Sequence, residues 1–409
     1  MKNLTETDAS SGHHRNMKKR PPESAVAVTW PQVAAFRLER QRLVKRLPAD
    51  RLLDVVRDHV GIQAQVMSLA ELQLNARLDG LRPTDVREAL WERRALVKTW
   101  AMRGTLHLIA SDDLGSFVAA APTRGQWGGP AWLKYFGVTA DELSALFAAI
   151  PEALGAEPLT RGELAVAAAS AARKPTLEAK LSSGWGSFLK PSAHAGDLVF
   201  GPDRGRNVTF VDPAAWLPPE AAASMARTVA ERGSPAAALG RLIERFLRLF
   251  PGADRDGVAR WWGGAAGRKT VRAVAEAGLE LADLDIDGEH GWALTADVDR
   301  LAMTKPFVGV RLLPGFDAYV NDLPRRVDAL LPVERHDEVH RIAGWVSPVV
   351  IVDGRVAGTW ELLPGQRGGV AVRPFGRWRA GVRRELVPEV DRIAAFLDRP
   401  LAIDIASGG

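Results

Sequence analysis

The stretch ALVKTWAMRGTLHLI, residues 95–109, decides the fold. Two short apolar runs flank Met102-Arg103-Gly104, which is the pattern of two strands joined by a tight turn. Upstream, Thr29 stands at an N-cap position before Trp30-Pro31 and an apolar periodicity, so a helix is expected to begin there. Further helical patterns cover residues 48–59, 67–78 and 83–94. Several helices followed by a hairpin with a basic tip predict a winged-helix unit over residues 28–135.

The same order of elements returns twice along the chain. Residues 136–217 contain a helix start with capping-box spacing at Thr160 and Glu163, and then a strand-turn-strand pattern with Arg204 and Arg206 at its tip. Residues 218–304 contain helical patterns and the hairpin LELADLDIDGEHGWALTAD, whose tip is acidic. We therefore expect tandem winged-helix (helix-turn-helix) units that are not equivalent in reading DNA.

The hydrophobic pattern of the sequence changes over residues 305–409. Short apolar runs are separated by Gly, Pro and Asp, and Asp353-Gly354 is a strong hairpin signal. A last helix is expected near residues 387–397. This pattern favours a small C-terminal β-barrel, which makes the predicted fold class α+β. Residues 1–27 are polar and lack periodicity, so they are predicted to form a disordered leader.

Composition limits the classes of function. The 409 residues are 46% hydrophobic and 25% charged, as in an ordinary soluble protein, and no apolar run approaches the roughly 18 residues that span a bilayer. The N-terminus lacks the apolar core of a signal peptide, so a cytoplasmic protein is expected. The absence of cysteine excludes disulfides, thiolate metal sites and cysteine nucleophiles. A net charge of +5 favours a polyanionic partner bound by a local patch.

Three familiar motifs occur only in incomplete form. The segment GGAAGRKT, residues 263–270, resembles a phosphate loop, but Arg268 interrupts the pattern and no strand precedes it. Residues 187–190 match Ser-x-x-Lys without the companion motifs of penicillin-recognising enzymes. His336 and His340 have metal-ligand spacing, but the intervening Glu is one place late for the zinc-protease motif. A charged surface turn is the better interpretation of the histidine segment.

The stretch HVGIQAQVMSLAELQL, residues 59–74, carries the candidate catalytic pair. Gln63 and Gln65 flank Ala64, and if the backbone there is extended both amides project to the same side. Taken alone, the pair is better interpreted as polar residues that cap backbone groups at a helix junction than as a catalytic pair. Likewise, Arg103 and His107 fit a wing tip and a satisfied core histidine.

Four segments in this order carry a resemblance: VGIQAQ, VKTWAMRGTLHLI, RLLPGFDAYV and VSPVVIVDGRVAGTWEL. Together they resemble the winged-helix DNA glycosylase family that unhooks DNA crosslinks, the AlkZ-like, azinomycin-resistance type, over about residues 28–400. The resemblance implies tandem winged helices, a β-barrel and a concave DNA channel. It also implies that Gln63 and Gln65 are catalytic, as the Gln-apolar-Gln element of this branch. The related branch has Asp in the last position, and Ala64 is smaller than the apolar residue usual there.

The implied function is a monofunctional DNA glycosylase, a hydrolase that cleaves the N-glycosidic bond of cationic N7-alkylated purines and unhooks interstrand crosslinks. It would act in DNA repair of alkylation damage or in antibiotic self-resistance. We expect a monomer without metal or cofactor, bound to duplex DNA. The candidate DNA-binding residues are Arg103, His107, Arg204, Arg206, Arg325 and Arg326. The alternatives are a non-catalytic winged-helix regulator, which the mixed-charge helices disfavour, and a small-molecule hydrolase, for which no nucleophile–base pair is found.

Overall fold

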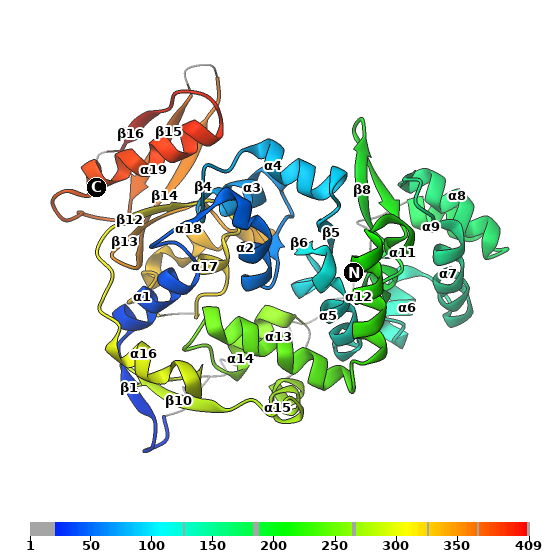
Figure 1. The fold of residues 1–409 in the computed structure, drawn as a ribbon, viewed down its shortest axis with the longest axis horizontal. Helices are drawn as coiled ribbons and strands as arrows, with labels where there is room; N and C mark the ends of the chain where they lie inside the picture. The colour runs from blue at the N-terminus through cyan, green and yellow to red at the C-terminus, as the bar shows by residue number, and fades with distance from the viewer. Residues whose placement is uncertain are drawn as a thin grey trace, which may run out of the picture.

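The computed structural model describes residues 21–125, 127–182, 188–263, 267–324, 327–365 and 368–406. Residues 1–20 of the expected leader lie outside these ranges. Figure 1 colours the elements in chain order. The predicted second unit lies at one end of the molecule and the C-terminal unit at the other. None of the described helices is long and apolar enough to cross a membrane.

The N-terminal helices begin where the sequence predicts. Thr29 and Gln32 form a reciprocal capping box at the start of the first helix, which satisfies backbone donors that the helix leaves open. Two short strands, β2 and β4, pair in parallel beside these helices. The elements are α1 (Trp30–Arg40), β2 (Leu47–Pro48), α2 (Leu52–Asp58), β3 (Ile62–Gln63), α3 (Met67–Asn75), β4 (Leu78–Asp79) and α4 (Pro83–Arg87).

The predicted hairpin is confirmed as β5 (Leu96–Trp100) and β6 (Leu106–Ala110), which pair antiparallel. It belongs to a six-stranded sheet of order β3-β6-β5-β8-β9-β7. Lys98 on β5 pairs with Phe200 on β8, so the hairpins of the first two predicted units form one sheet. The sequence did not predict this merger, because it depends on a pairing between strands about a hundred residues apart.

The predicted second unit contributes helices around the far half of that sheet. The Thr160–Glu163 capping box is confirmed at the start of α8. The helix expected over residues 176–190 is α9 at its start, whereas residues 183–187 lie outside the described part. The elements are α6 (Pro130–Phe136), α7 (Ala140–Ala153), β7 (Leu159–Thr160), α8 (Arg161–Ala171), α9 (Thr176–Ser182), α10 (Lys190–Ala195), β8 (Val199–Arg204) and β9 (Asn207–Val211).

The third group of helices packs around α13, which buries Leu242, Ile243 and Phe246 against α5 and α15. Its hairpin is confirmed as β10 and β11. The strand β1 pairs in parallel with β10, so Val26 and Ala27 lie in a strand and not in a disordered leader. The elements are β1 (Val26–Val28), α5 (Leu114–Ala120), α11 (Pro213–Trp216), α12 (Pro219–Ala230), α13 (Pro235–Leu249), α14 (Arg255–Trp262), α15 (Gly267–Glu276), β10 (Leu281–Ile286) and β11 (Glu289–Leu294).

The C-terminal unit is a five-stranded sheet of order β12-β13-β14-β15-β16, with no pairing between β12 and β16 in the described strands. Asp353 and Gly354 have φ of 51° and 86°, as the predicted hairpin turn requires. The last helix, α19, packs along β12. The elements are α16 (Val298–Met303), β12 (Val310–Leu313), α17 (Ala318–Asn321), α18 (His336–Val339), β13 (Val349–Val352), β14 (Arg355–Leu363), β15 (Gly369–Pro374), α19 (Val382–Phe396) and β16 (Ala402–Ile405).

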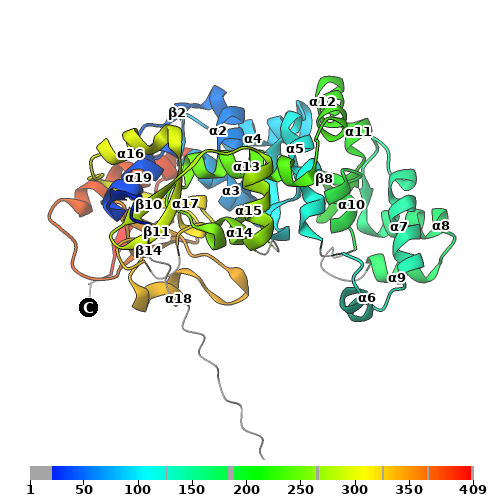
Figure 2. The same cartoon turned by 90° about the horizontal axis from the view of Figure 1, so that it is seen from below.

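One hydrophobic core joins the two ends of the chain. Val55 and Leu74, from α2 and α3, lie in the same buried cluster as Leu312, Val350 and Leu386 from the C-terminal unit. This packing brings the segment VGIQAQ beside RLLPGFDAYV, although about 250 residues separate them. In Figure 2, α6 and α18 project to the same side of the molecule, and α14 is set back between them.

Candidate active site

The backbone around Gln63 is held at the edge of the six-stranded sheet. After α2 ends, Val60 and Gly61 both have positive φ, 56° and 91°, and turn the chain into β3. A Cβ at Gly61 would lie 3.2 Å from the carbonyl oxygen of Leu108, so a glycine suits this turn. Gln63 then pairs with His107 on β6, and the amide of Gln73 on α3 donates to the Gln63 carbonyl at 3.0 Å.

The side-chain amide of Gln63 has a fixed orientation. Its Oε1 accepts hydrogen bonds from Asn321 Nδ2 at 2.7 Å and from Arg103 Nη2 at 2.9 Å. A carbonyl oxygen has two lone pairs, so both are occupied. The side chain is only 8% exposed, which limits the rotamers open to it. The Nε2 group, which has no hydrogen-bond partner among the described residues, is therefore the end of Gln63 left to bind a ligand.

Arg103 is the cation that orients Gln63. It lies in the turn between β5 and β6 with φ of 56°, and its guanidinium bridges Gln63 and the carboxylate of Asp322, with an Nη1 to Oδ1 distance of 3.0 Å. Burial raises the pKa of Asp322, an effect that Arg103 and then Arg37 and Arg260 oppose. The sequence proposed Arg103 as a DNA contact at a wing tip, but its side chain turns inward and is engaged within the protein.

A buried ion pair positions Asn321. Arg77 and Asp317 are both fully buried and form two hydrogen bonds, at 2.7 and 2.9 Å. Asp317 Oδ1 also accepts from the backbone N–H of Tyr319 and so caps α17, which ends at Asn321. The pair thus ties the turn after α3 to α17, the helix that carries a partner of Gln63.

His59 completes this buried network as a neutral acceptor. Arg77 Nε donates to His59 Nε2 at 2.8 Å, and His59 Nδ1 lies 2.8 Å from the carbonyl oxygen of Val55. Burial, and next the charge of Arg77, lower the pKa of His59 well below its usual value. The ring is therefore neutral with its proton on Nδ1, because Nε2 must accept.

Gln65 and His107 have contrasting environments. Gln65 is exposed, and its Oε1 accepts from the backbone N–H of Leu106 at 3.4 Å. His107 is 1% exposed, and its Nδ1 lies 3.0 Å from the carbonyl oxygen of Thr105. Burial and the charge of Arg103 lower the pKa of His107 to about 3. His107 is therefore a neutral interior residue in this structure, and it is not placed at a surface that DNA can reach.

The remaining proposed DNA contacts that the structure describes belong to the second hairpin. Arg204 and Arg206 are exposed at the end of the β8–β9 hairpin, and Arg204 pairs with Glu163 at 2.7 Å. Arg325 and Arg326 lie outside the described residues. Sequence reasoning missed Asn321, Asp317 and Asp322. The only signal for Asp317 was its place as a single carboxylate in the apolar segment RLLPGFDAYV, and Asn321 is the residue directly after that segment.

No group of three or more metal-ligating side chains occurs among the described residues. His336 and His340, singled out for their spacing, stack with ring centroids 4.8 Å apart, and His336 lies on the short helix α18. The two carboxylates tied into the Gln63 network, Asp317 and Asp322, are each held by an arginine. The site thus offers neutral amides with fixed partners.

Comparison with known proteins identifies the family. A family model described as DNA glycosylase AlkZ-like matches residues 56–396. An interstrand DNA cross-link repair glycosylase from Streptomyces sahachiroi is 35% identical over 380 residues, which cover 91% of this chain and 96% of that protein. The solved structure of Streptomyces sahachiroi DNA glycosylase AlkZ superposes with a TM-score of 0.82 at 32% identity and covers 93% of this chain and 100% of that one. The chain therefore belongs to the AlkZ-like DNA glycosylase family.

Proposed function

We propose that this protein is a monofunctional DNA glycosylase that hydrolyses the N-glycosidic bond of cationic N7-alkylated purines, including those in interstrand crosslinks. The single observation that carries the proposal is the Gln63 amide, held by Arg103 and Asn321 within a chain that belongs to a DNA glycosylase family. Gln63 and Gln65 are the proposed catalytic residues. Repair of alkylation damage, or resistance to an alkylating antibiotic, is the proposed role.

The chemistry of the leaving group explains why neutral amides suffice. A purine alkylated at N7 already carries a positive charge, so it leaves as a neutral base without a proton from a general acid. What the protein must supply is an oriented water and an environment that tolerates positive charge on the sugar. The charge of Arg103 is balanced by Asp322, so it does not add a net repulsion against an oxocarbenium-like sugar.

We propose different roles for the two amides on the basis of their hydrogen bonds. Gln63 Oε1 is fully occupied, so Gln63 acts through Nε2 and donates to the oxygen of the attacking water. Gln65 is exposed, and a single long contact holds its Oε1. It accepts a hydrogen bond from the same water and orients the second lone pair toward the sugar. Water needs both a donor and an acceptor here, which is why a pair of amides fits the task.

An interstrand crosslink imposes a geometric demand. The damaged base is tethered to the opposite strand, so it cannot rotate into a deep pocket as most glycosylases require. Gln65 is exposed, so one member of the proposed catalytic pair is reached without a deep pocket. We propose that duplex DNA lies between α18 and α6, over the set-back helix α14 (Figure 2).

The finer architecture belongs to the same proposal. The helices before each hairpin support three winged-helix units over residues 28–135, 136–217 and 218–304, and the five-stranded sheet over residues 305–409 supports an incomplete barrel. Arg204 and Arg206 are proposed phosphate contacts at the end of the second hairpin, as are Arg325 and Arg326. A monomer bound to one duplex is the proposed assembly.

The decisive experiment is base release from duplex DNA that contains one N7-methylguanine. Under single turnover, chromatography should show free N7-methylguanine, whereas a matched duplex with neutral hypoxanthine should release far less. A duplex crosslinked through two guanine N7 atoms should be separated into single strands on a denaturing gel. If the protein binds the methylated duplex and releases no base, the proposed function is wrong.

A further inference from the structure

Basic side chains converge on the turn that carries Arg103. A Cβ built on Gly104 would lie 3.5 Å from Arg124 Nη2 and 3.9 Å from Lys190 Nζ. Arg124 comes from the turn after α5, and Lys190 is the first residue of α10. Two cations from separate elements therefore point at the same position above a residue that has no side chain.

Arg124 is a buried cation without an acidic partner among the described residues. Its side chain is 3% exposed, and Nη1 donates to the carbonyl oxygens of Ala101 at 3.1 Å and Trp262 at 2.7 Å. Burial and the nearby charge of Arg103 lower the pKa of Arg124 to about 10, so it stays protonated at neutral pH. Its Nε is buried and lacks a hydrogen-bond partner. A buried charge of this kind is costly unless an anion balances it.

Lys190 adds a second uncompensated charge. It is half-buried, and no carboxylate of the described residues forms an ion pair with it. Burial and the charge of Arg124 lower the pKa of its ammonium group. The two cations thus repel each other and have no anion between them in the described part of the protein. A bound anion would relieve both the repulsion and the desolvation.

Two glycines lie at this turn and face the cations. Gly104 has φ of 66°, and Gly263 has φ of 81°. A Cβ on Gly263 would lie 2.6 Å from Arg103 Cα and 3.4 Å from Arg124 Nη2. Side chains at these positions would fill the space or displace the turn. Glycine allows the backbone of Gly263 to approach Arg103 closely and places no side chain next to Arg124.

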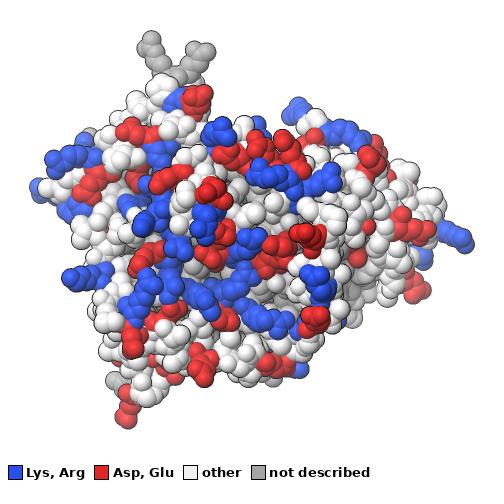
Figure 3. Space-filling model, viewed as in Figure 1, with Lys and Arg blue, Asp and Glu red and all other residues white. Residues whose placement is uncertain are grey.

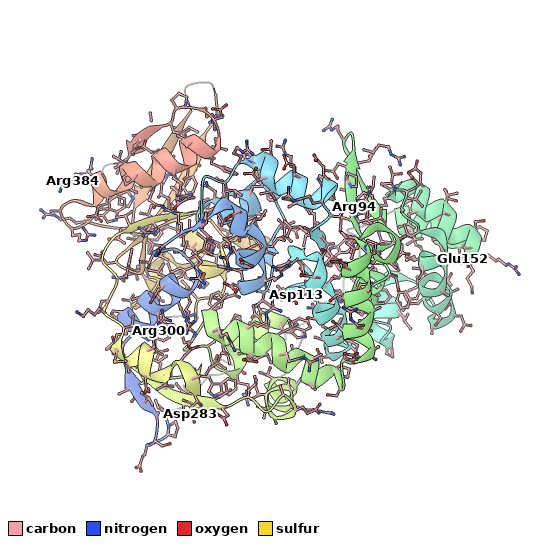
Figure 4. All side chains as sticks on the ribbon, in the orientation of Figure 1. Arg94, Asp113, Glu152, Asp283, Arg300 and Arg384 are labelled. Carbon is pink, nitrogen blue, oxygen red and sulfur yellow. The ribbon has the colours of Figure 1, made fainter. Side chains whose placement is uncertain are left out.

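A second basic surface of the protein consists of arginines that are paired with carboxylates. Figure 3 shows basic side chains gathered over α1, α13 and α16 and interleaved with acidic ones. They line a cleft in which Arg42 pairs with Asp58, Arg57 with Asp112 and Arg245 with Asp113. In Figure 4, Asp113 lies near the centre of this face. These cations are already paired with carboxylates of the protein, whereas Arg124 and Lys190 have no such partner among the described residues.

We propose that the turn at Gly104, together with Arg124 and Lys190, binds the phosphodiester of the damaged strand that lies beside the damaged nucleotide. This inference rests on the proposed glycosylase function. The backbone phosphate is the anion class that fits, because it is singly charged, is present at every nucleotide and accepts hydrogen bonds from both cations. Since Arg103 precedes Gly104 and holds Gln63 Oε1, the bound phosphate also sets the distance between the strand and the proposed catalytic amide.

The test is a scan with single methylphosphonates, which remove the charge of one phosphate at a time around an N7-methylguanine in duplex DNA. Affinity is measured by fluorescence anisotropy with the wild type, Lys190→Ala and the control Lys305→Ala, an exposed lysine beyond α16. One substituted position should weaken wild-type binding about tenfold and should have a smaller effect in Lys190→Ala, in which only Arg124 still contacts that phosphate. That variant should also lower the salt slope by about 0.9 relative to the wild type, whereas the control should not.

A second variant tests whether blocking the proposed site, without removal of a positive charge, also abolishes the response. Asparagine tolerates positive φ, so Gly104→Asn is expected to fold while its side chain occupies the space beside Arg124 and Lys190. The DNA affinity of Gly104→Asn should no longer depend on whether that position carries a phosphate or a methylphosphonate, and its melting temperature should be unchanged. If neither variant alters the response at any position, the proposal is wrong even when excision is normal. If the coupling appears but the wild type releases no base, the phosphate site stands and the glycosylase function fails.

Discussion

The orientation of the Gln63 amide is testable through Asn321, which donates one of its two hydrogen bonds. In Asn321→Ala the Arg103 contact remains, so Gln63 keeps its orientation and loses one neutral hydrogen bond. Such a bond contributes about 0.5–1.5 kcal/mol, which corresponds to a roughly 2- to 13-fold slower excision. In Asn321→Asp an acceptor faces Oε1, so Gln63 is expected to rotate and present Nε2 to the carboxylate.

Because of that rotation, Asn321→Asp should slow excision more than Asn321→Ala does. A hydrogen bond to a charged group contributes about 1.5–3 kcal/mol, and it must be broken to restore the active orientation, so excision should slow by roughly 10- to 150-fold. The assay is single-turnover release of N7-methylguanine, with DNA affinity and melting temperature measured in parallel. A wild-type rate for Asn321→Asp, or a greater loss for Asn321→Ala than for Asn321→Asp, with folding intact, would refute the assigned orientation.

Four further expectations follow from the site and its surroundings. Gln63→Ala and Gln65→Ala should each slow base release by roughly 10²–10⁴-fold with nearly unchanged DNA affinity, whereas Gln65→Asp should keep measurable activity in the same assay. Excision should survive dialysis against EDTA, and restoration of lost activity by zinc would contradict the amide mechanism. DNA binding should weaken steeply with salt, and Arg206→Ala should reduce the slope of a log–log titration by about 0.9. Burial lowers the pKa values of His107 and of His194, a buried residue of α10, to about 3, so below pH 6.5 the unfolded chain binds more protons at these histidines than the folded one. Stability should therefore fall as the pH decreases from 6.5 toward 3, by about 2 kcal/mol for each histidine at pH 5, as measured by denaturant titrations.

Features that depend on local geometry were predictable from the sequence. The helix start at Thr29, the capping box at Thr160 and the Asp353-Gly354 turn each rest on a few neighbouring residues, and the structure confirms them. In such cases the same short-range hydrogen bonds form whatever the rest of the chain does.

The missed features depend on contacts between distant residues. Asn321 and Asp322 reach Gln63 and Arg103 only because the C-terminal sheet packs against α2 and α3, and no local pattern encodes that contact. Arg103 was assigned to an exposed tip because turns usually lie at the surface. Its positive φ and the buried carboxylate of Asp322 direct the side chain inward, and sequence periodicity carries no information about either.

The parallel pairing of β1 with β10 sets an order of events during synthesis of the protein. Val26 pairs with Leu284, so the first strand leaves the ribosome long before its partner exists. At roughly 5–20 residues per second, the interval is on the order of 10–50 s. Through that time Val28 and Trp30, buried in the finished protein, lack the part of their core that Leu284 and Ile286 supply. A gene that begins at α1 would leave the edge of β10 open to pairing with another chain, whereas an extension placed before Val26 would leave the pairing intact.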